Sequence, residues 1–119
     1  TCALPILQWL GTAGARLDDL LTWLPCRLLA LSLGQLGPAL RDGASDPSPN
    51  AGVSQAAYAH ALGLQLGGLN RYRGIEKAKP LLNSSGRGAD QTGVQAILKA
   101  SQRCALLWLS ISGIVALLA

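Results

Sequence analysis

The side chains with the most chemistry lie in one polar stretch, residues 41–52 (RDGASDPSPNAG), which separates two apolar segments. Its two prolines fix their own φ angles and push the residues before them toward extended backbone, which predicts a stiff loop. Arg41 offers a planar guanidinium suited to phosphate or carboxylate, and Asp42 offers oxygens to a cation such as Mg²⁺. Ser48 and Asn50 can both donate and accept hydrogen bonds. The alternative is a surface linker, because loops of this composition are often only turns.

Arg27 is a second candidate, because it lies inside residues 20–40, a mostly apolar stretch about as long as the ~20 residues that cross a bilayer. Pro25 removes a backbone donor and predicts a kink beside it. An arginine at membrane depth costs from ~3 to over 10 kcal/mol unless it snorkels or finds a polar partner. Asp19 lies about 12 Å before Arg27 along a straight helix, too far for direct pairing. A phosphate between them is one interpretation, and an ordinary helix-start acid is the other.

Gly67 and Gly68 form a predicted turn close to Arg71 and Arg73, where backbone N–H groups could approach an anion. The established glycine-rich nucleotide motifs are absent from the sequence, so the pattern is weak as a phosphate loop.

The cysteines and the histidine predict no metal centre. Cys2, Cys26 and Cys104 lie far apart, and His60 is the only histidine. Cys26 and Cys104 sit in apolar runs and are expected to be small buried thiols. His60 is expected to be a packing or surface residue.

The composition indicates a membrane. Half of the 119 residues are apolar and only 13% are charged, while Phe is absent and aromatic residues make up 4%. An apolar content made mostly of Leu and Ala suits lipid-facing helices, although a soluble helical bundle is the alternative. Because the sequence contains no Met and opens with Thr1, we interpret the chain as a fragment or a processed product.

These patterns predict a mainly α fold, a fragment of a polytopic helical membrane protein with a cytoplasmic polar loop region. Residues 1–40 are expected to form membrane-associated helices, and residues 41–91 a loop region with a short helix at 55–62, capped by Ser54 and closed by Gly63. Residues 64–66 alternate like a strand, and residues 77–88 suggest a flexible exposed connection. A capping box at 92–95 opens a C-terminal helix, residues 92–119, that enters the membrane.

The distribution of charge predicts the topology. Residues 71–103 contain seven Lys and Arg against two acids. The positive-inside rule then puts residues 41–103 in the cytoplasm and makes the protein a multi-pass component of the cell membrane, in contact with lipid. No aromatic platform interleaves these charges, so nucleic acid is not an expected partner.

Several short blocks together resemble a known family. They are ARLDD at 15–19, TWLPCRL at 22–28, RD at 41–42, DPSPNAG at 46–52, ALGLQLGG at 61–68 and YRG at 72–74. In this order and spacing they closely resemble the C-terminal part of the cobalamin-biosynthesis membrane proteins of the CobD/CbiB type, the adenosylcobinamide-phosphate synthases. The resemblance covers about residues 11–119.

The resemblance implies an enzyme of cobalamin (vitamin B12) biosynthesis, a ligase that uses ATP and Mg²⁺ to join adenosylcobyric acid, a corrinoid, to aminopropanol or its phosphate. Arg27, Arg41, Asp42, Ser48 and Asn50 are the expected catalytic residues, with both arginines on anions and Asp42 on Mg²⁺ or the incoming ammonium. The expected substrate-binding residues are Asp19, Gly52, Gly67, Gly68 and Tyr72.

The chain also departs from the family pattern. Val53 and Gln55 stand where the family usually has Trp and an acid, and Asp46 stands where it often has His. Residues 1–10 do not match the upstream motif. The chain corresponds to about a third of the expected protein, so it is expected to be inactive without the upstream remainder. The alternative function is a non-enzymatic membrane sensor of the AmpE type, in which the same loop binds a ligand without turnover.

Overall fold

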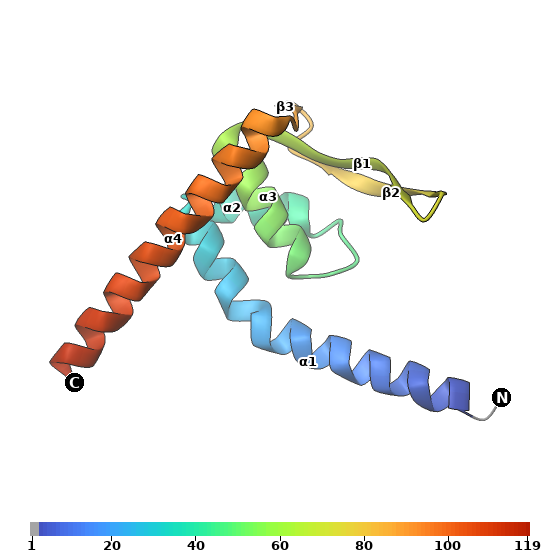
Figure 1. Cartoon of the computed structure of the whole chain (residues 1–119), viewed down its shortest axis with the longest axis horizontal. Helices are drawn as coiled ribbons and strands as arrows, with labels where there is room; N and C mark the ends of the chain where they lie inside the picture. Colours follow the sequence, from blue (N-terminus) through green and yellow to red (C-terminus); the bar gives the residue numbers. More distant parts are fainter. Residues whose placement is uncertain (1–2) are drawn as a thin grey trace.

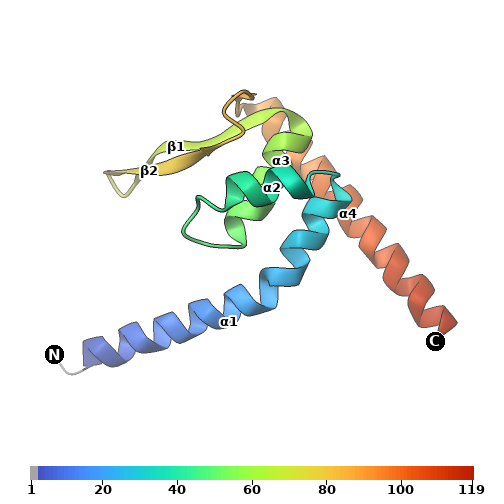
Figure 2. The same ribbon diagram turned by 180° about the vertical axis from the view of Figure 1, so that it is seen from behind.

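Four helices and a small three-stranded sheet make up the computed structural model, which describes residues 3–119 (Figure 1). In chain order these are α1 (Ala3–Ser32), α2 (Leu36–Gly43), α3 (Ala51–Leu62), β1 (Leu64–Tyr72), β2 (Ile75–Leu82), β3 (Arg87–Gly88) and α4 (Gln91–Leu118). Helices α2 and α3 pack together at the centre, while α1 and α4 run outward from them in different directions, as the opposite views agree (Figures 1 and 2). The predicted mainly helical fold is confirmed, but the sheet was not predicted.

Helix α1 continues through Pro25 and bends part-way along its length (Figure 1). A proline inside a helix cannot donate to the carbonyl four residues earlier and its ring crowds that carbonyl, so a bend is expected there. The bend turns the second part of α1 toward α2 and α3, and it thereby brings the Arg27 region against the polar loop.

The prediction of a single span over residues 20–40 is wrong, because the helix stops at Ser32. Gly34 adopts a left-handed conformation with φ of 69°. The N–H of Gly34 donates to the Leu31 carbonyl and that of Gln35 donates to the Ala30 carbonyl, both at 2.9 Å. This pair of bonds is the Schellman ending that glycine favours. Pro38 then lies in the first turn of α2, where its missing N–H costs nothing.

The centre of the molecule is built from small residues on α2 and α3. Gly43 and Gly52 meet at the crossing, and a Cβ placed on Gly52 would lie 2.5 Å from the Gly43 carbonyl oxygen. The surrounding core contains mainly alanines: Ala30, Ala39, Ala56, Ala57 and Ala59, with Val53 and Leu82. Side chains this small let the two helix backbones approach closely. The short helix was predicted to begin at Gln55 with Ser54 as its N-cap, but it begins at Ala51. The Ser54 hydroxyl instead donates to the Asn50 and Ala51 carbonyls. Gly63 closes it with φ of 64°, as predicted.

We expect Gly52→Ala to destabilise the fold by roughly 2 kcal/mol, because the new methyl group overlaps backbone atoms of α2 that cannot rotate away. Gly37→Ala is the matched control, since a Cβ at Gly37 meets nothing within 4 Å. Thermal unfolding in detergent, followed by circular dichroism, measures both variants. Equal stability of the two variants would contradict the close crossing.

Strands β1 and β2 form a hairpin that projects from the helices (Figure 1), so the prediction of a flexible connection over residues 77–88 is wrong for β2. Gly67 and Gly68 do not form a turn. They lie within β1 with φ of 93° and 84°, at a bulge in its pairing with β2. The turn falls instead at Arg73 and Gly74, whose positive φ angles are those of a two-residue hairpin loop. Strand β3 pairs in parallel with the start of β1.

Helix α4 begins two residues earlier than the predicted capping box, which has Thr92 as its N-cap, allows. Asp90 is its N-cap, and the Asp90 carboxylate accepts a 2.7 Å hydrogen bond from the Gly93 N–H. This bond, supported by the nearby Arg87 guanidinium, holds the pKa of Asp90 below its usual value. The carboxylate form is therefore the one that supports the start of α4.

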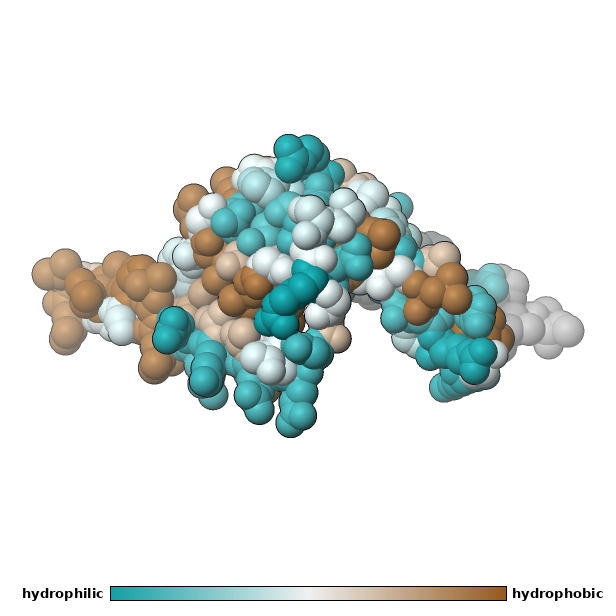
Figure 3. Space-filling view, turned by 90° about the horizontal axis from the view of Figure 1, so that it is seen from above, coloured by the Kyte–Doolittle hydropathy of each residue, from teal (hydrophilic) through white to brown (hydrophobic). Residues whose placement is uncertain are grey.

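Within the described part of the chain, α4 is the one helix long and apolar enough to cross a membrane. Its C-terminal end is almost uniformly hydrophobic at the left of Figure 3, while hydrophilic side chains gather over the middle of the molecule. Two side-chain hydrogen bonds tie α4 to α3 and to the end of α1. Tyr58 on α3 meets Ser101 at 2.7 Å, and the Trp108 indole N–H donates to the Ser32 hydroxyl at 2.9 Å.

Candidate functional site

The polar loop is fastened to α1 by Asn50, which is only 3% exposed. The Asn50 amide nitrogen donates to the Asp19 carbonyl at 2.5 Å and to the Thr22 hydroxyl at 2.9 Å. Its side-chain oxygen accepts a 3.1 Å bond from Arg27. We call these residues, with Trp23, the Asn50 junction. Asn50 was expected in an open polar loop, but it is a buried residue whose three side-chain hydrogen bonds all hold the loop on α1.

Arg27 is held in this junction by a single terminal nitrogen. Its Nη1 donates to the Trp23 carbonyl at 2.9 Å as well as to Asn50, and its guanidinium carbon lies 4.1 Å from the centre of the Trp23 ring. Stacking on an indole ring fixes the plane of the guanidinium. The N–H groups of Nε and Nη2 have no hydrogen-bond partner among the described residues, so they remain able to bind an anion.

A second polar cluster joins α2, α3 and the end of β2. Asp42 is 23% exposed, and its Oδ2 accepts bonds from the His60 ring at 2.7 Å and from the Asn83 N–H at 3.2 Å. Because an ionised carboxylate only accepts, the His60 nitrogen facing it carries the proton. The other oxygen lies 3.6 Å from Arg41, which is itself 75% exposed. Asp42 therefore organises the fold as well as presenting a charge.

The hydrogen bond from His60 is the main reason that the pKa of Asp42 lies below its usual value of 3.8, and the Asn83 N–H and Arg41 lower it further. Burial acts in the opposite direction. A carboxylate whose pKa is lowered on folding contributes stability that is present above pH 3.8 and lost as the pH falls through the folded value.

We expect His60→Ala to move the pKa of Asp42 upward, toward 3.8, because the largest lowering cause is gone. The stability that Asp42 loses as the pH falls below 3.8 should then be smaller than in the unchanged protein, because its folded and unfolded pKa values lie closer together. A carboxyl-carbon NMR titration in detergent micelles reads the Asp42 midpoint directly. Lys79→Gln, on the hairpin, should leave the midpoint unchanged, and an unmoved midpoint in His60→Ala would refute the assignment.

The remaining loop residues hold the loop's own shape. The Asp46 carboxylate accepts a 2.9 Å bond from the Ser48 N–H, and the Ser48 hydroxyl accepts a 3.3 Å bond from the Ala51 N–H at the start of α3. Gly52 lies at the α2–α3 crossing, where it gives room for backbone contact. Ser48 and Gly52 thus have structural roles that the sequence did not predict, and their predicted contacts with substrate stay predictions.

The candidates on the hairpin lie apart from the other two groups. Gly67 and Gly68 shape the β1 bulge, and Tyr72 is 52% exposed near the hairpin turn. No hydrogen bond or ion pair in residues 3–119 joins them to the Asn50 junction or to Asp42. The structure therefore brings Asp19, Arg27 and Asn50 together, places Arg41 and Asp42 in a second cluster, and leaves the hairpin glycines and Tyr72 outside both.

Three participants were not predicted as site residues. His60 and Asn83 reach Asp42 from positions 18 and 41 residues away in sequence, and no local pattern signals such contacts. Trp23 could have been found, because residues four apart on a helix are neighbours, and Trp23 and Arg27 have that spacing.

Of the two cysteines expected to be buried thiols, Cys104 confirms the prediction and Cys26 meets it only in part. Cys104 is buried, Cys26 is half-buried, and both are free thiols. Cys2 lies outside the described residues.

Residues 3–119 contain no group of three or more His, Cys, Asp and Glu side chains that could hold a metal ion. Asp42 by itself does not fit Mg²⁺, because one oxygen already accepts two hydrogen bonds and the other faces Arg41. A magnesium ion there would have to displace His60 or lie beside a guanidinium.

Comparison with known proteins agrees with the resemblance seen in the motifs. The sequence model of the family described as CobD/Cbib protein matches residues 5–101. The chain belongs to the CobD/CbiB family. A CobD/CbiB relative named Cobalamin biosynthesis protein CobD, from Synechocystis sp., is 43% identical over 120 residues, which cover 92% of this chain and 34% of that protein.

Other relatives give the same result. Cobalamin biosynthesis protein CobD of Geobacter metallireducens is 40% identical over 94 residues, covering 69% of this chain and 30% of that protein. Cobalamin biosynthesis protein CbiB of Salmonella typhi is 33% identical over 113 residues, covering 85% of this chain and 34% of that protein. This CobD/CbiB chain thus spans about a third of the length of the curated relatives that it matches. No solved structure matches it.

Proposed function

We propose that this chain acts in cobalamin biosynthesis as part of a longer CobD/CbiB protein. In that protein the reaction is ATP-dependent amide formation between the carboxylate of adenosylcobyric acid and the amine of aminopropanol or its phosphate. The family match over residues 5–101 is the observation that carries the proposal. Relatives named for cobalamin biosynthesis are 33–46% identical to this chain over the aligned regions, which supports the proposal.

The proposed part of this chain in that reaction is to hold anions in place. Amide formation from a carboxylate needs activation by phosphoryl transfer, so the site must neutralise phosphate charge and align the amine. Arg27 suits this role because its guanidinium is fixed in the Asn50 junction while several of its N–H donors stay unused. Arg41 is exposed and offers a second cation beside Asp42. Asp42 would receive the incoming ammonium on the oxygen that accepts no hydrogen bond, beside the exposed Arg41, and Ser48 would hydrogen bond the corrin amides.

We further propose that ATP and Mg²⁺ act in the full-length protein and that ligands for the metal come mainly from outside this chain. Asp42 is already engaged by His60, Asn83 and Arg41, which supports this division. Bound Mg²⁺ would supply charge neutralisation of the phosphates.

The proposal is tested with a full-length protein that carries this segment, purified in detergent and given adenosylcobyric acid, aminopropanol phosphate and ATP. We expect a product heavier by the linked amine, detected by mass spectrometry, and none when ATP is omitted. The same gene should restore growth of a cobalamin auxotroph that lacks its own CobD/CbiB. Binding of a corrinoid without any product would contradict the ligase and support the sensor.

For the location we propose a multi-pass protein of the cell membrane, anchored in this segment by α4 and by the apolar part of α1, with residues 41–103 on the cytoplasmic side. The length and apolar character of α4 and the basic residues between 71 and 103 support this placement.

This placement predicts that the chain stays in the membrane after alkaline washing and that trypsin cuts at Arg71 and Arg73 near the hairpin turn only in inverted vesicles. Both arginines are exposed, so the membrane alone decides whether the protease reaches them. Cleavage in sealed right-side-out vesicles would reverse the topology. Recovery of the whole chain as a monodisperse soluble species would reject membrane integration.

A further inference from the structure

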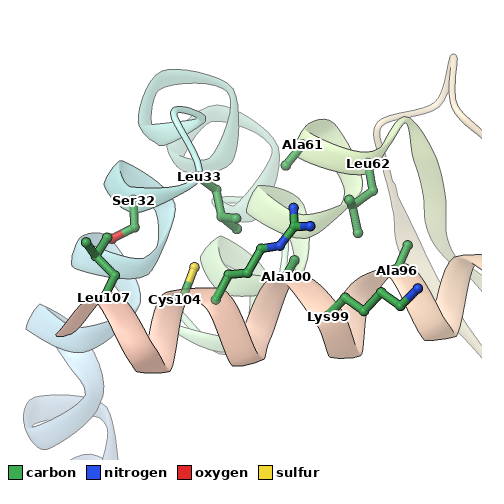
Figure 4. A pocket seen from close by; sticks show the side chains of 10 residues that line it. Ser32, Leu33, Ala61, Leu62, Ala96, Lys99, Ala100, Cys104 and Leu107 are labelled. Atoms are coloured by element: carbon green, nitrogen blue, oxygen red, sulfur yellow. The ribbon is translucent and has the colours of Figure 1, made fainter. Parts of the chain in front are cut away.

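A pocket of about 490 Å³ lies where the ends of α1 and α3 face the middle of α4 (Figure 4). Ser32 and Leu33 line it from the end of α1, and Ala61 and Leu62 line it from α3 (Figure 4). Helix α4 closes the other side with small or apolar residues, Ala96, Ala100, Cys104 and Leu107, and with the basic residues Lys99 and Arg103. The pocket is therefore apolar, with two cations on one wall.

The two cations are not neutralised within the fold. Neither Lys99 nor Arg103 makes a salt bridge with any residue in the described range 3–119, although four other ion pairs form there. Their positions differ by four residues, so they lie on the same face of α4. A pair of unneutralised cations at the wall of a cavity favours an anionic ligand.

The position of the pocket along α4 indicates where that ligand lies. Arg103 is the last charged residue of the chain, and the uncharged segment 104–119 that follows is about 24 Å long as a helix. Lys99 and Arg103 thus stand at the depth of the phosphate groups if α4 enters the bilayer. Leu107, one turn further along, is half-exposed at the depth where hydrocarbon begins.

We propose that this pocket binds one anionic phospholipid, with its phosphate on Lys99 and Arg103 and an acyl chain along Leu107. Basic pockets between membrane helices on the cytoplasmic side are known to take such headgroups. The neighbouring pocket of about 270 Å³, between α1 and α4, has no charged residue in its lining and offers nothing to a phosphate. The assignment does not depend on the ligation reaction proposed above.

Native mass spectrometry of the chain released from bilayers that mix phosphatidylcholine and phosphatidylglycerol tests the site. We expect one phosphatidylglycerol retained per chain in preference to phosphatidylcholine. The double variant Lys99→Gln/Arg103→Gln should bind it more than tenfold more weakly, since each basic residue near an anionic lipid surface is worth roughly fivefold. Ala100→Leu fills the pocket without changing any charge and should also abolish retention.

The matched control is Lys77→Gln/Lys79→Gln on β2, which removes the same charge away from the pocket and should retain the lipid. Circular dichroism confirms that each variant keeps its helices, and Ala100→Leu still tests the site if the double variant does not fold. An equal loss in the β2 control would show diffuse attraction and overturn the proposal. Equal retention of both lipids, or displacement by soluble glycerol phosphate at matched concentration, would also overturn it.

Discussion

Asn50→Ala should abolish adenosylcobinamide formation by the full-length protein while its abundance in the membrane stays unchanged. The substitution leaves the Asp19 carbonyl and the Thr22 hydroxyl without their donor and frees Arg27 from its acceptor. A hydrogen bond lost between half-buried groups costs about 0.5–1.5 kcal/mol, or up to about 3 when one partner is charged as Arg27 is, so we expect the three bonds together to cost about 3 kcal/mol of folding stability. Membrane insertion depends on the apolar helices and should not change.

Both effects are measured together, as the ligation rate at equal membrane abundance and the thermal unfolding of the purified protein. The matched control is Asn70→Ala in β1, whose side chain makes no hydrogen bond within the described residues, and it should change stability by less than ~0.5 kcal/mol. Normal growth of a cobalamin auxotroph that carries Asn50→Ala would contradict the prediction.

A second substitution at Asn50 separates the bond that its side-chain oxygen accepts from the bonds that its side-chain nitrogen donates. Asn50→Asp keeps an oxygen for Arg27 but turns a negative oxygen toward the Asp19 carbonyl, where the amide had donated. We expect Asn50→Asp to lose as much stability as Asn50→Ala, because the donors rather than the acceptor tie the loop to α1. A stable Asn50→Asp protein would show that the charge pair with Arg27 is the stronger link.

The sequence predicted the long C-terminal helix best, because α4 has a sustained apolar run after a polar start and needs no tertiary partner to be recognised. The mistaken span over residues 20–40 has a specific cause. The average hydrophobicity of residues 20–40 suits one span, but Gly34 followed by Pro38 is the pattern of one helix ending and another beginning. This local stop signal, and not the average hydrophobicity, sets the end of α1.

The glycine pair in β1 shows a different limit. Gly67 and Gly68 were expected to form a turn, and they do adopt positive φ angles, but this backbone conformation serves a turn or a bulge equally well. Only the pairing partner decides between them, and the partner strand β2 contains Pro80 and two lysines, which made it look like a loop. The sequence thus indicated an unusual backbone conformation at the two glycines, but it did not indicate that they lie in a paired strand.

For the candidate site, too, the residue types were predictable from the sequence but their contacts were not. The residue types predicted that Arg27 could bind an anion and that Asn50 could hydrogen bond a ligand. The two residues lie 23 positions apart in the sequence. Only the bend of α1 and the packing of α3 bring their side chains within 3.1 Å. Because a buried amide has the same composition signal as an exposed one, the sequence alone presented Asn50 as a ligand-facing residue. Its burial shows that part of its importance is structural.

Arg27→Lys should lose most of the ligation activity of the full-length protein, at least tenfold, and behave nearly as badly as Arg27→Ala. An ammonium keeps the charge, but it lacks the planar fork that stacks on Trp23 while bonding both the Trp23 carbonyl and Asn50. It also has no second edge left to grip a phosphate with two parallel hydrogen bonds. If Arg27 only snorkelled to the membrane surface, Lys would replace it with little effect.

The decisive measurement compares ligation rates and nucleotide affinities of Arg27→Lys, Arg27→Ala and the unchanged protein at equal membrane abundance. Arg16→Lys is the matched control, because Arg16 is exposed on the same helix and makes no ion pair within residues 3–119. We expect both Arg27 variants to weaken nucleotide or aminopropanol-phosphate binding and Arg16→Lys to leave it unchanged. An Arg27→Lys protein as active as the unchanged one would remove Arg27 from the anion site, and the guanidinium would then serve only to anchor the loop to α1.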